Sequence, residues 1–253
     1  MNEINGSIKR IHQKELLNKY NKFINHPVNF LIKHNVSPNK ITFIGFIISI
    51  TTAFLIAIGW IYFSIWLAWI VPFLMGLAGA FDLFDGEVAR RTDKETQAGA
   101  FLDSNLDRIS DAVLILGLIY GGLVNYVLGY IILFLVIMIS YSRSRAENEG
   151  VNMKGVGIME RAERIIFMLF ALLFEMWFYF LSFIFLGAPI TILVPFITRI
   201  PVTPVFLVAI IVYTLALLYT IAQRIFFTFK TLNEKNSNEK MPNPSHLYSL
   251  SFK

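Results

Sequence analysis

Four aspartates lie close together in the sequence, at spacings that suit the binding of metal ions. Asp82 and Asp85 are three residues apart, and Asp103 and Asp107 are four apart, so each pair projects from one face if its segment is helical. A short connection separates the two pairs, which lets all four carboxylates converge. Oxygen ligands without histidine or cysteine suit Mg²⁺ or Mn²⁺. Two such ions would neutralise the four negative charges, and paired divalent ions serve displacement reactions at phosphorus.

A second interpretation treats these aspartates as helix caps or as ion-pair partners of Arg90, Arg91 and Arg108. That interpretation suits a single aspartate at a helix end. Four carboxylates held close together repel one another strongly unless cations lie between them. Unpaired carboxylates are also costly in a membrane-spanning helix. The spacing therefore favours a metal site.

The elements that must position the aspartates are membrane-spanning helices. Of the 253 residues, 56% are apolar and 15% are charged, and the mean hydropathy is +0.61, whereas soluble domains carry about 25% charged residues. The absence of cysteine excludes a disulfide framework and thiolate metal sites. Because a bilayer core needs roughly 20 apolar residues per helix, the long uncharged stretches predict an all-α integral membrane protein with six transmembrane helices. The expected spans are 41–58, 61–90, 97–120, 125–146, 160–186 and 203–230.

The distribution of Lys and Arg predicts the orientation in the membrane. With six spans, the charged connections all fall on one side and only Arg199 falls on the other. We therefore expect a multi-pass protein of the cell membrane. Its charged connections, both termini and the aspartates are expected to face the cytoplasm. Residues 8–25 place apolar and basic side chains at helical spacing, which predicts an amphipathic interfacial helix. We thus expect a basic juxtamembrane segment at 1–36, a six-helix domain at 37–230 and a polar cytoplasmic tail at 231–253.

The two aspartate segments together resemble the signature of the CDP-alcohol phosphotransferase family. Asp-x-x-Asp-Gly-x-x-Ala-Arg occupies residues 82–90, and after eight further residues Gly-x-x-x-Asp-x-x-x-Asp occupies residues 99–107. The resemblance implies that a hydroxyl attacks the β-phosphorus of a CDP-linked alcohol, usually a CDP-lipid, and that CMP is released. It implies that the four aspartates hold two Mg²⁺ or Mn²⁺ ions, and that Asp107 is also the general base. It further implies a six-helix fold and a homodimer.

Six residues are expected to bind the CDP-lipid donor. Gly86 and Ala89 lack bulk one helical turn apart, which would let a cytidine ring or a pyrophosphate approach, although small residues also serve helix packing. The segment at residues 37–42 resembles the family's Pro-Asn-x-x-Thr element, although by itself it is a helix start with a cap and a proline. The resemblance implies the donor-binding set Asn39, Thr42, Gly86, Ala89, Arg90 and Thr96.

A cluster of arginines at the ends of the predicted helices indicates a phosphorylated acceptor. Guanidinium groups bind phosphate bidentately, whereas arginines at helix ends also anchor proteins at the membrane surface. The segments around residues 143–147 and 160–164 resemble those of the family branch that makes phosphatidylinositol phosphate and archaetidylinositol phosphate. The expected acceptor is therefore 1L-myo-inositol 1-phosphate, and the expected donor is CDP-archaeol or CDP-diacylglycerol. The acceptor-phosphate set comprises Ser140, Arg143, Arg145, Arg161, Arg164 and Arg224.

Several alternatives stay open on the sequence alone. Glycerol 3-phosphate as acceptor would also explain the arginines, and CDP-inositol as donor would give a soluble di-inositol phosphate. A divalent cation transporter would use the aspartates as an ion path, but such a protein is expected to carry ionisable groups near the midplane and internal repeats. No nucleic acid partner is expected. Glu175 lies deep in the fifth span, where we favour a hydrogen-bonded packing role over a functional one.

Overall fold

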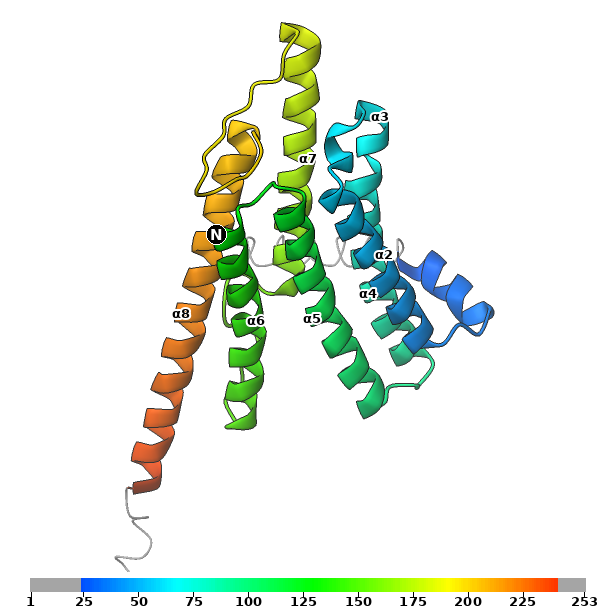
Figure 1. Ribbon diagram of the computed structural model, residues 1–253. Helices are drawn as coiled ribbons and strands as arrows, with labels where there is room; N and C mark the ends of the chain where they lie inside the picture. The colour runs from blue at the N-terminus through cyan, green and yellow to red at the C-terminus, as the bar shows by residue number, and fades with distance from the viewer. Residues whose placement is uncertain (1–23, 241–253) are drawn as a thin grey trace, which may run out of the picture.

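The computed structural model describes residues 24–240, which form a bundle of α-helices (Figure 1). The only β-type pairing among these residues is an isolated bridge between Ile192 and Val202, so the all-helical prediction is confirmed for this part of the chain. Residues 24–33 are helical. The elements that follow are α2 (Pro38–Ala57), the 3₁₀ turn η1 (Trp60–Tyr62), α3 (Ile65–Ala68), α4 (Ile70–Arg91), α5 (Gln97–Tyr120), α6 (Tyr126–Asn148), α7 (Arg161–Leu186) and α8 (Pro204–Lys240).

Five helical stretches in the described part of the chain are long and apolar enough to cross a membrane. They are Pro38–Ala57, Ile65–Arg91, Tyr126–Asn148, Arg161–Leu186 and Pro204–Lys235. The remaining long helix, α5, has 24 residues. Residues 103–111 of this helix include three aspartates and an arginine, and this polarity separates it from the other five.

The second predicted span, 61–90, starts later than the sequence indicates. Ser64 is extended, with φ −161° and ψ 144°, so the 3₁₀ turn before it does not continue into the helix. A further interruption at Trp69 separates α3 from α4. Its cause lies in Pro72, which has no N–H to donate to the carbonyl of Ala68 four residues earlier.

The two ends of the chain are described only in part. The predicted amphipathic helix at residues 8–25 lies almost entirely outside the described residues. Residues 24–33 pack against α2 and α4 through a small apolar cluster. The predicted tail, 231–253, is described as far as residue 240, and over that stretch α8 simply continues.

Helix α2 packs against both aspartate helices and sets their spacing (Figure 1). On the α5 side, a Cβ at Gly117 would come within 2.6 Å of the carbonyl oxygen of Ala53 in α2. On the α4 side, a Cβ at Gly45 of α2 would lie 3.1 Å from the Cβ of Phe81. Glycine at these points lets the helices approach closely. α2 therefore holds α4 and α5 beside one another, and α7 packs against α4 from elsewhere in the bundle.

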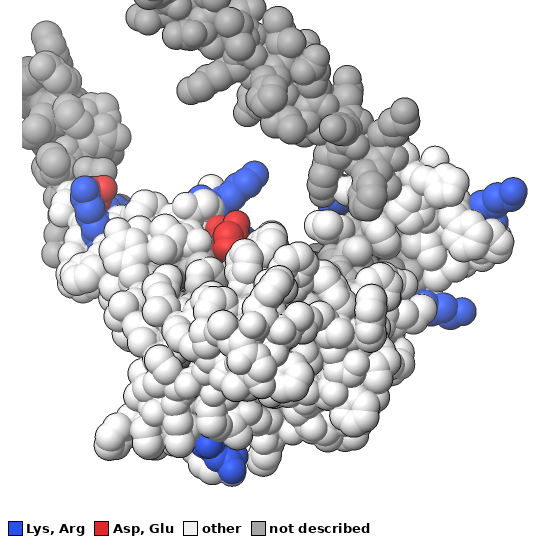
Figure 2. All heavy atoms as spheres, turned by 90° about the horizontal axis from the view of Figure 1, so that it is seen from above, with Lys and Arg blue, Asp and Glu red and all other residues white. Residues whose placement is uncertain are grey.

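Charged side chains are unevenly distributed over the bundle. Seen from above, the end at which α7 finishes is mostly uncharged surface, with few Lys, Arg, Asp or Glu atoms in view (Figure 2). The aspartates lie toward the opposite end, where α4 finishes and α5 begins (Figure 1). This asymmetry agrees with the pattern of charge along the sequence.

Candidate active site

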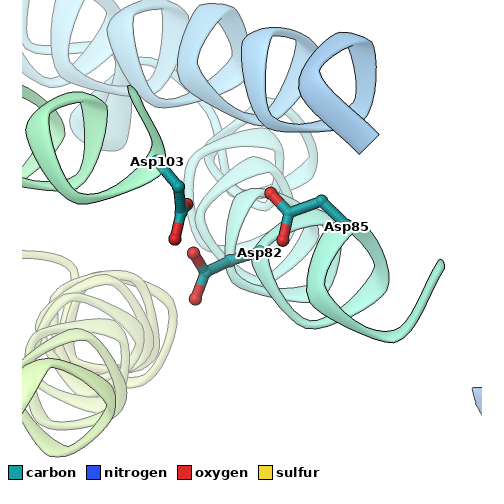
Figure 3. Close-up of side chains that lie close together, drawn as sticks. All are labelled: Asp82, Asp85 and Asp103. Atoms are coloured by element: carbon teal, nitrogen blue, oxygen red, sulfur yellow. The ribbon is translucent and has the colours of Figure 1, made fainter. Parts of the chain in front are cut away.

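Three of the four aspartates form a compact carboxylate cluster between α4 and α5. Asp82, Asp85 and Asp103 each offer a carboxylate oxygen, and these oxygens lie within 4.8 Å of one another. Figure 3 shows the three side chains pointing toward a common centre. Asp85 Oδ2 and Asp103 Oδ1 are buried without a hydrogen-bond partner among the described residues. Such oxygens require a cation or a donor, and an all-oxygen set fits Mg²⁺ or Mn²⁺.

The fourth aspartate, Asp107, is linked to this cluster through an arginine. Arg161, the first residue of α7, places its Nη1 atom 2.5 Å from Asp82 Oδ1 and its Nη2 atom 2.8 Å from Asp107 Oδ1. The spacing in the sequence predicted four convergent carboxylates. The structure brings three of these carboxylates together, and one guanidinium links the fourth, Asp107, to Asp82.

A cavity of about 550 Å³ opens on the side of Asp85 and Asp103. Local structure explains how its lining is formed. Thr96 caps α5 by accepting a 3.0 Å hydrogen bond from the N–H of Gly99, and Thr42 donates back to Pro38 in the first turn of α2. The lining includes five of the six predicted donor-binding residues, namely Asn39, Thr42, Gly86, Ala89 and Thr96.

Arg90, the sixth predicted donor-binding residue, does not line this cavity. Its guanidinium lies 2.8 Å from Glu87, and its side chain is largely exposed. Lys94, which sequence reasoning did not select, does line the cavity. Its position in the connection between the two aspartate helices is the signal that could have identified it, because a cation there suits a diphosphate.

A second cavity, of about 380 Å³, lies on the side of Asp107. Its residues come from α5, α6, α7 and α8 and from the connection before α7, so it forms only when these helices pack together. Among the predicted acceptor residues, its lining includes Ser140, Arg143, Arg161, Arg164 and Arg224. Arg145 does not line it, because its Nη2 atom pairs with Glu149 at 2.6 Å on the exposed surface of α6.

Two arginines of the second cavity are buried and held rigidly. Arg224 donates to the carbonyl oxygens of Ile139, at 2.5 Å, and Val156, at 2.9 Å. Arg164 Nη2 lies 2.6 Å from Asp111 Oδ2. Sequence reasoning gave no role to Asp111, although it lies one turn beyond Asp107 on the same face of α5. That spacing is the signal that could have identified it.

Glu175 lies apart from the aspartates and is fully buried. It accepts a 2.6 Å hydrogen bond from the Tyr62 hydroxyl and hydrogen bonds from both the backbone N–H and the hydroxyl of Thr203. Thr203 in turn accepts from the N–H of Phe206 in the first turn of α8. Glu175 therefore ties α7 to η1 and to the start of α8, which confirms that it is hydrogen-bonded as predicted.

Comparison with known proteins agrees with this geometry. The archaetidylinositol phosphate synthase of Pyrococcus horikoshii is 36% identical over 140 residues, which cover 55% of this chain and 71% of that protein. The phosphatidylinositol phosphate synthase of Streptomyces avermitilis is 32% identical over 169 residues, which cover 62% of this chain and 67% of that protein.

Solved structures share the fold. A crystal structure of the Mycobacterium tuberculosis phosphatidylinositol phosphate synthase with CDP-DAG bound superimposes with a TM-score of 0.61 at 24% identity, over 82% of this chain and 94% of that chain. A second structure of that enzyme, in complex with manganese and citrate, has a TM-score of 0.60 at 25% identity, over 80% of this chain and 87% of that chain.

The model of one protein family, described as CDP-alcohol phosphatidyltransferase, matches residues 35–231. The match covers most of the chain and includes both aspartate helices and both cavities. The chain therefore belongs to the CDP-alcohol phosphatidyltransferase family and is a transferase of this type.

Proposed function

We propose that this enzyme transfers a phosphatidyl-type group from a CDP-lipid to a hydroxyl of 1L-myo-inositol 1-phosphate and releases CMP. One observation carries the proposal: the aspartate cluster lies between two cavities of different chemistry. Asp85 and Asp103 line a cavity with small and polar side chains, whereas Asp107 lines a cavity with five arginines. Relatives named for archaetidylinositol phosphate and phosphatidylinositol phosphate synthesis support the same reaction.

The aspartates would hold two divalent ions, Mg²⁺ or Mn²⁺. These ligands are suitable because all are carboxylates, and two of them keep a buried oxygen that has no hydrogen-bond partner among the described residues. Bound ions would supply charge neutralisation at the donor diphosphate. A manganese complex of the structurally similar Mycobacterium tuberculosis enzyme supports the use of a divalent metal. The proposed ligands are Asp82, Asp85, Asp103 and Asp107.

The donor would bind in the first cavity. Gly86 and Ala89 leave room for the cytidine or the diphosphate, and Asn39, Thr42 and Thr96 offer polar groups around it. Arg90 stays a predicted contact, which requires its guanidinium to leave Glu87. The CDP-diacylglycerol in the similar structure supports a CDP-lipid as donor.

Asp107 would act as the general base. It lines the second cavity and belongs to the proposed metal site, so it is placed to take the proton of an acceptor hydroxyl. The acceptor oxygen then forms a bond to the β-phosphorus of the donor. The bond from that phosphorus to the oxygen bridging to the α-phosphate breaks, and CMP leaves with the bond's electron pair.

The acceptor phosphate would bind among the arginines of the second cavity. Arg164 and Arg224 are fixed by their buried partners, and a fixed guanidinium binds phosphate with little loss of side-chain freedom. Ser140, Arg143 and Arg161 complete the lining. Arg145 stays a predicted phosphate contact, and to make that contact its side chain would have to leave Glu149 and turn toward the cavity.

For the membrane arrangement we propose six spans, namely the five apolar helical stretches together with α5. Its polar half contributes to the site and so need not face lipid, which removes the reason for counting only five. The positive-inside pattern places both termini and the site on the cytoplasmic side of the cell membrane. We retain the division into segments at 1–36, 37–230 and 231–253, with an interfacial helix in the first, and we propose a homodimer by analogy with the family.

The test is CMP release from purified enzyme with Mg²⁺ or Mn²⁺. Donors are CDP-archaeol, CDP-diacylglycerol and CDP-inositol, and acceptors are inositol, inositol 1-phosphate, glycerol 3-phosphate and serine. Inositol 1-phosphate with a CDP-lipid should give the highest kcat/KM. Faster turnover of glycerol 3-phosphate with every donor would reject the acceptor, and activity only with CDP-inositol would reject the lipid donor. Membership of a transferase family favours all these reactions over cation transport.

A further inference from the structure

Arg161 joins the two halves of the proposed site. It pairs with Asp82 and Asp107 through Nη1 and Nη2, and it also lines the arginine-rich second cavity. Its Nε is buried without a hydrogen-bond partner among the described residues, and this atom lies 3.9 Å from Asp111 Oδ1. Within the described part of the chain, one guanidinium thus has bonds on the metal side and an unsatisfied donor that lies near a carboxylate on the acceptor side.

The two carboxylates bound to Arg161 are two of the four proposed metal ligands. A carboxylate oxygen that accepts a guanidinium N–H directs a lone pair at the arginine. If the same oxygen also binds a divalent ion, the ion and the positively charged guanidinium lie close together and repel each other. The mutual repulsion is strongest where water is scarce, and Arg161 is only 25% exposed. The guanidinium and an ion therefore cannot both use these two oxygens at full strength.

The second cavity offers Arg161 another set of partners. Arg164, one helical turn further along α7, already lies against Asp111, so the same carboxylate is within reach of both arginines. A phosphate group in this cavity would add a stronger, bidentate partner for a guanidinium. Either partner would draw Arg161 away from Asp82 and Asp107.

We infer that Arg161 and one divalent ion compete for Asp82 and Asp107, and that a phosphate-bearing acceptor relieves the competition by drawing the guanidinium into the second cavity. This inference rests on the proposed function, because it assumes the metal ligands and the acceptor cavity named there. Its consequence is reciprocal: acceptor binding raises metal affinity, and metal binding raises acceptor affinity by the same factor. Arg161 is a positioning residue in this scheme.

The experiment measures Mn²⁺ binding directly, without turnover. The full chain is purified in detergent and titrated with Mn²⁺, while free Mn²⁺ is followed by its electron paramagnetic resonance signal. Arg161→Gln should raise the affinity of the weaker Mn²⁺ site about tenfold, within the range usual for coupling between two ligands. Arg161→Lys, which keeps the charge but cannot bridge two carboxylates, should give an intermediate value. Arg161→Lys also keeps the test available if Arg161→Gln folds poorly.

Arg143→Gln is the matched control. It removes the same charge from the same cavity, but Arg143 pairs with Glu147 and not with the cluster aspartates. Direct competition predicts a change of less than about threefold for this variant, whereas a general field effect would raise Mn²⁺ affinity similarly in both variants. Equal increases in Arg143→Gln and Arg161→Gln would overturn the inference.

A second arm adds inositol 1-phosphate to the titration, with a protein-free titration to correct for chelation by the ligand. The wild-type protein should bind Mn²⁺ about fivefold more tightly in its presence, and Arg161→Gln should show no such gain. A gain that persists in Arg161→Gln would overturn the inference while leaving the metal site intact. If the wild-type protein binds no Mn²⁺, the proposed metal site fails, and the inference fails with it.

Discussion

Asp111→Asn should destabilise the protein more than any exposed charge removal, because it breaks a buried ion pair. Arg164 and Asp111 pair at 2.6 Å with side chains that are 4% and 9% exposed. Removing one partner of a buried pair costs about 3–5 kcal/mol, because the other charge is left buried without compensation. Asparagine still accepts a hydrogen bond, so we expect a loss near the lower limit, about 3 kcal/mol.

The chain contains a second ion pair with the same N–O distance, which serves as a control. Arg145 and Glu149 also pair at 2.6 Å, but their side chains are 63% and 45% exposed. Water screens that pair, so Glu149→Gln should cost less than about 1 kcal/mol. The two variants differ mainly in burial, which makes their difference a measure of desolvation.

The assay is equilibrium unfolding of both variants in the same detergent, followed by tryptophan fluorescence. The double variant Asp111→Asn with Arg164→Gln removes both charges and should recover most of the lost stability. It should not recover acceptor affinity, since Arg164 is proposed to contact the phosphate. Similar losses for Asp111→Asn and Glu149→Gln, or no recovery in the double variant, would refute the claim that desolvation dominates here.

Three further outcomes are expected. Asp107→Asn should abolish CMP release while CDP-lipid binding, measured by calorimetry, persists; retained turnover would remove the base assignment. Arg143→Ala should raise the acceptor KM more than Arg145→Ala does, because only the former lines the second cavity, and the opposite order would favour Arg145 as the phosphate contact. Gly117→Ala should cost about 1–3 kcal/mol of unfolding free energy through overpacking against α2. Gly79→Ala, where an added Cβ meets no atom of residues 24–240 within 4 Å, should be neutral or stabilising, and equal losses at the two glycines would contradict the close-packing explanation.

The helices and the aspartate faces could be predicted from the sequence because both depend on short-range periodicity. Residues three or four apart share a helix face, so Asp82 with Asp85 and Asp103 with Asp107 needed no tertiary information. Hydropathy located the long helices for the same reason. It missed the interruption before α4, because Pro72 carries no charge and so does not interrupt an uncharged stretch, although it removes one backbone hydrogen bond.

The same periodicity, applied more strictly, separates two of the arginines. Arg143 and Arg145 are two residues apart in α6, and residues at that spacing point to different sides of a helix. Only Arg143 lines the cavity. Sequence reasoning placed both at one phosphate because it considered which end of the helix they occupy and not which face.

The sequence by itself determined the residue types, the helix faces and the polarity of the bundle. Only the tertiary structure decided that Arg161 reaches Asp82 and Asp107, that Arg164 is buried against Asp111, and that the aspartates divide two cavities. The physical reason is that these contacts join residues that are far apart in the sequence. Arg164 and Asp111, for example, are separated by 53 residues. Rotation and depth of one helix against another are set by side-chain packing, and local periodicity carries no information about them.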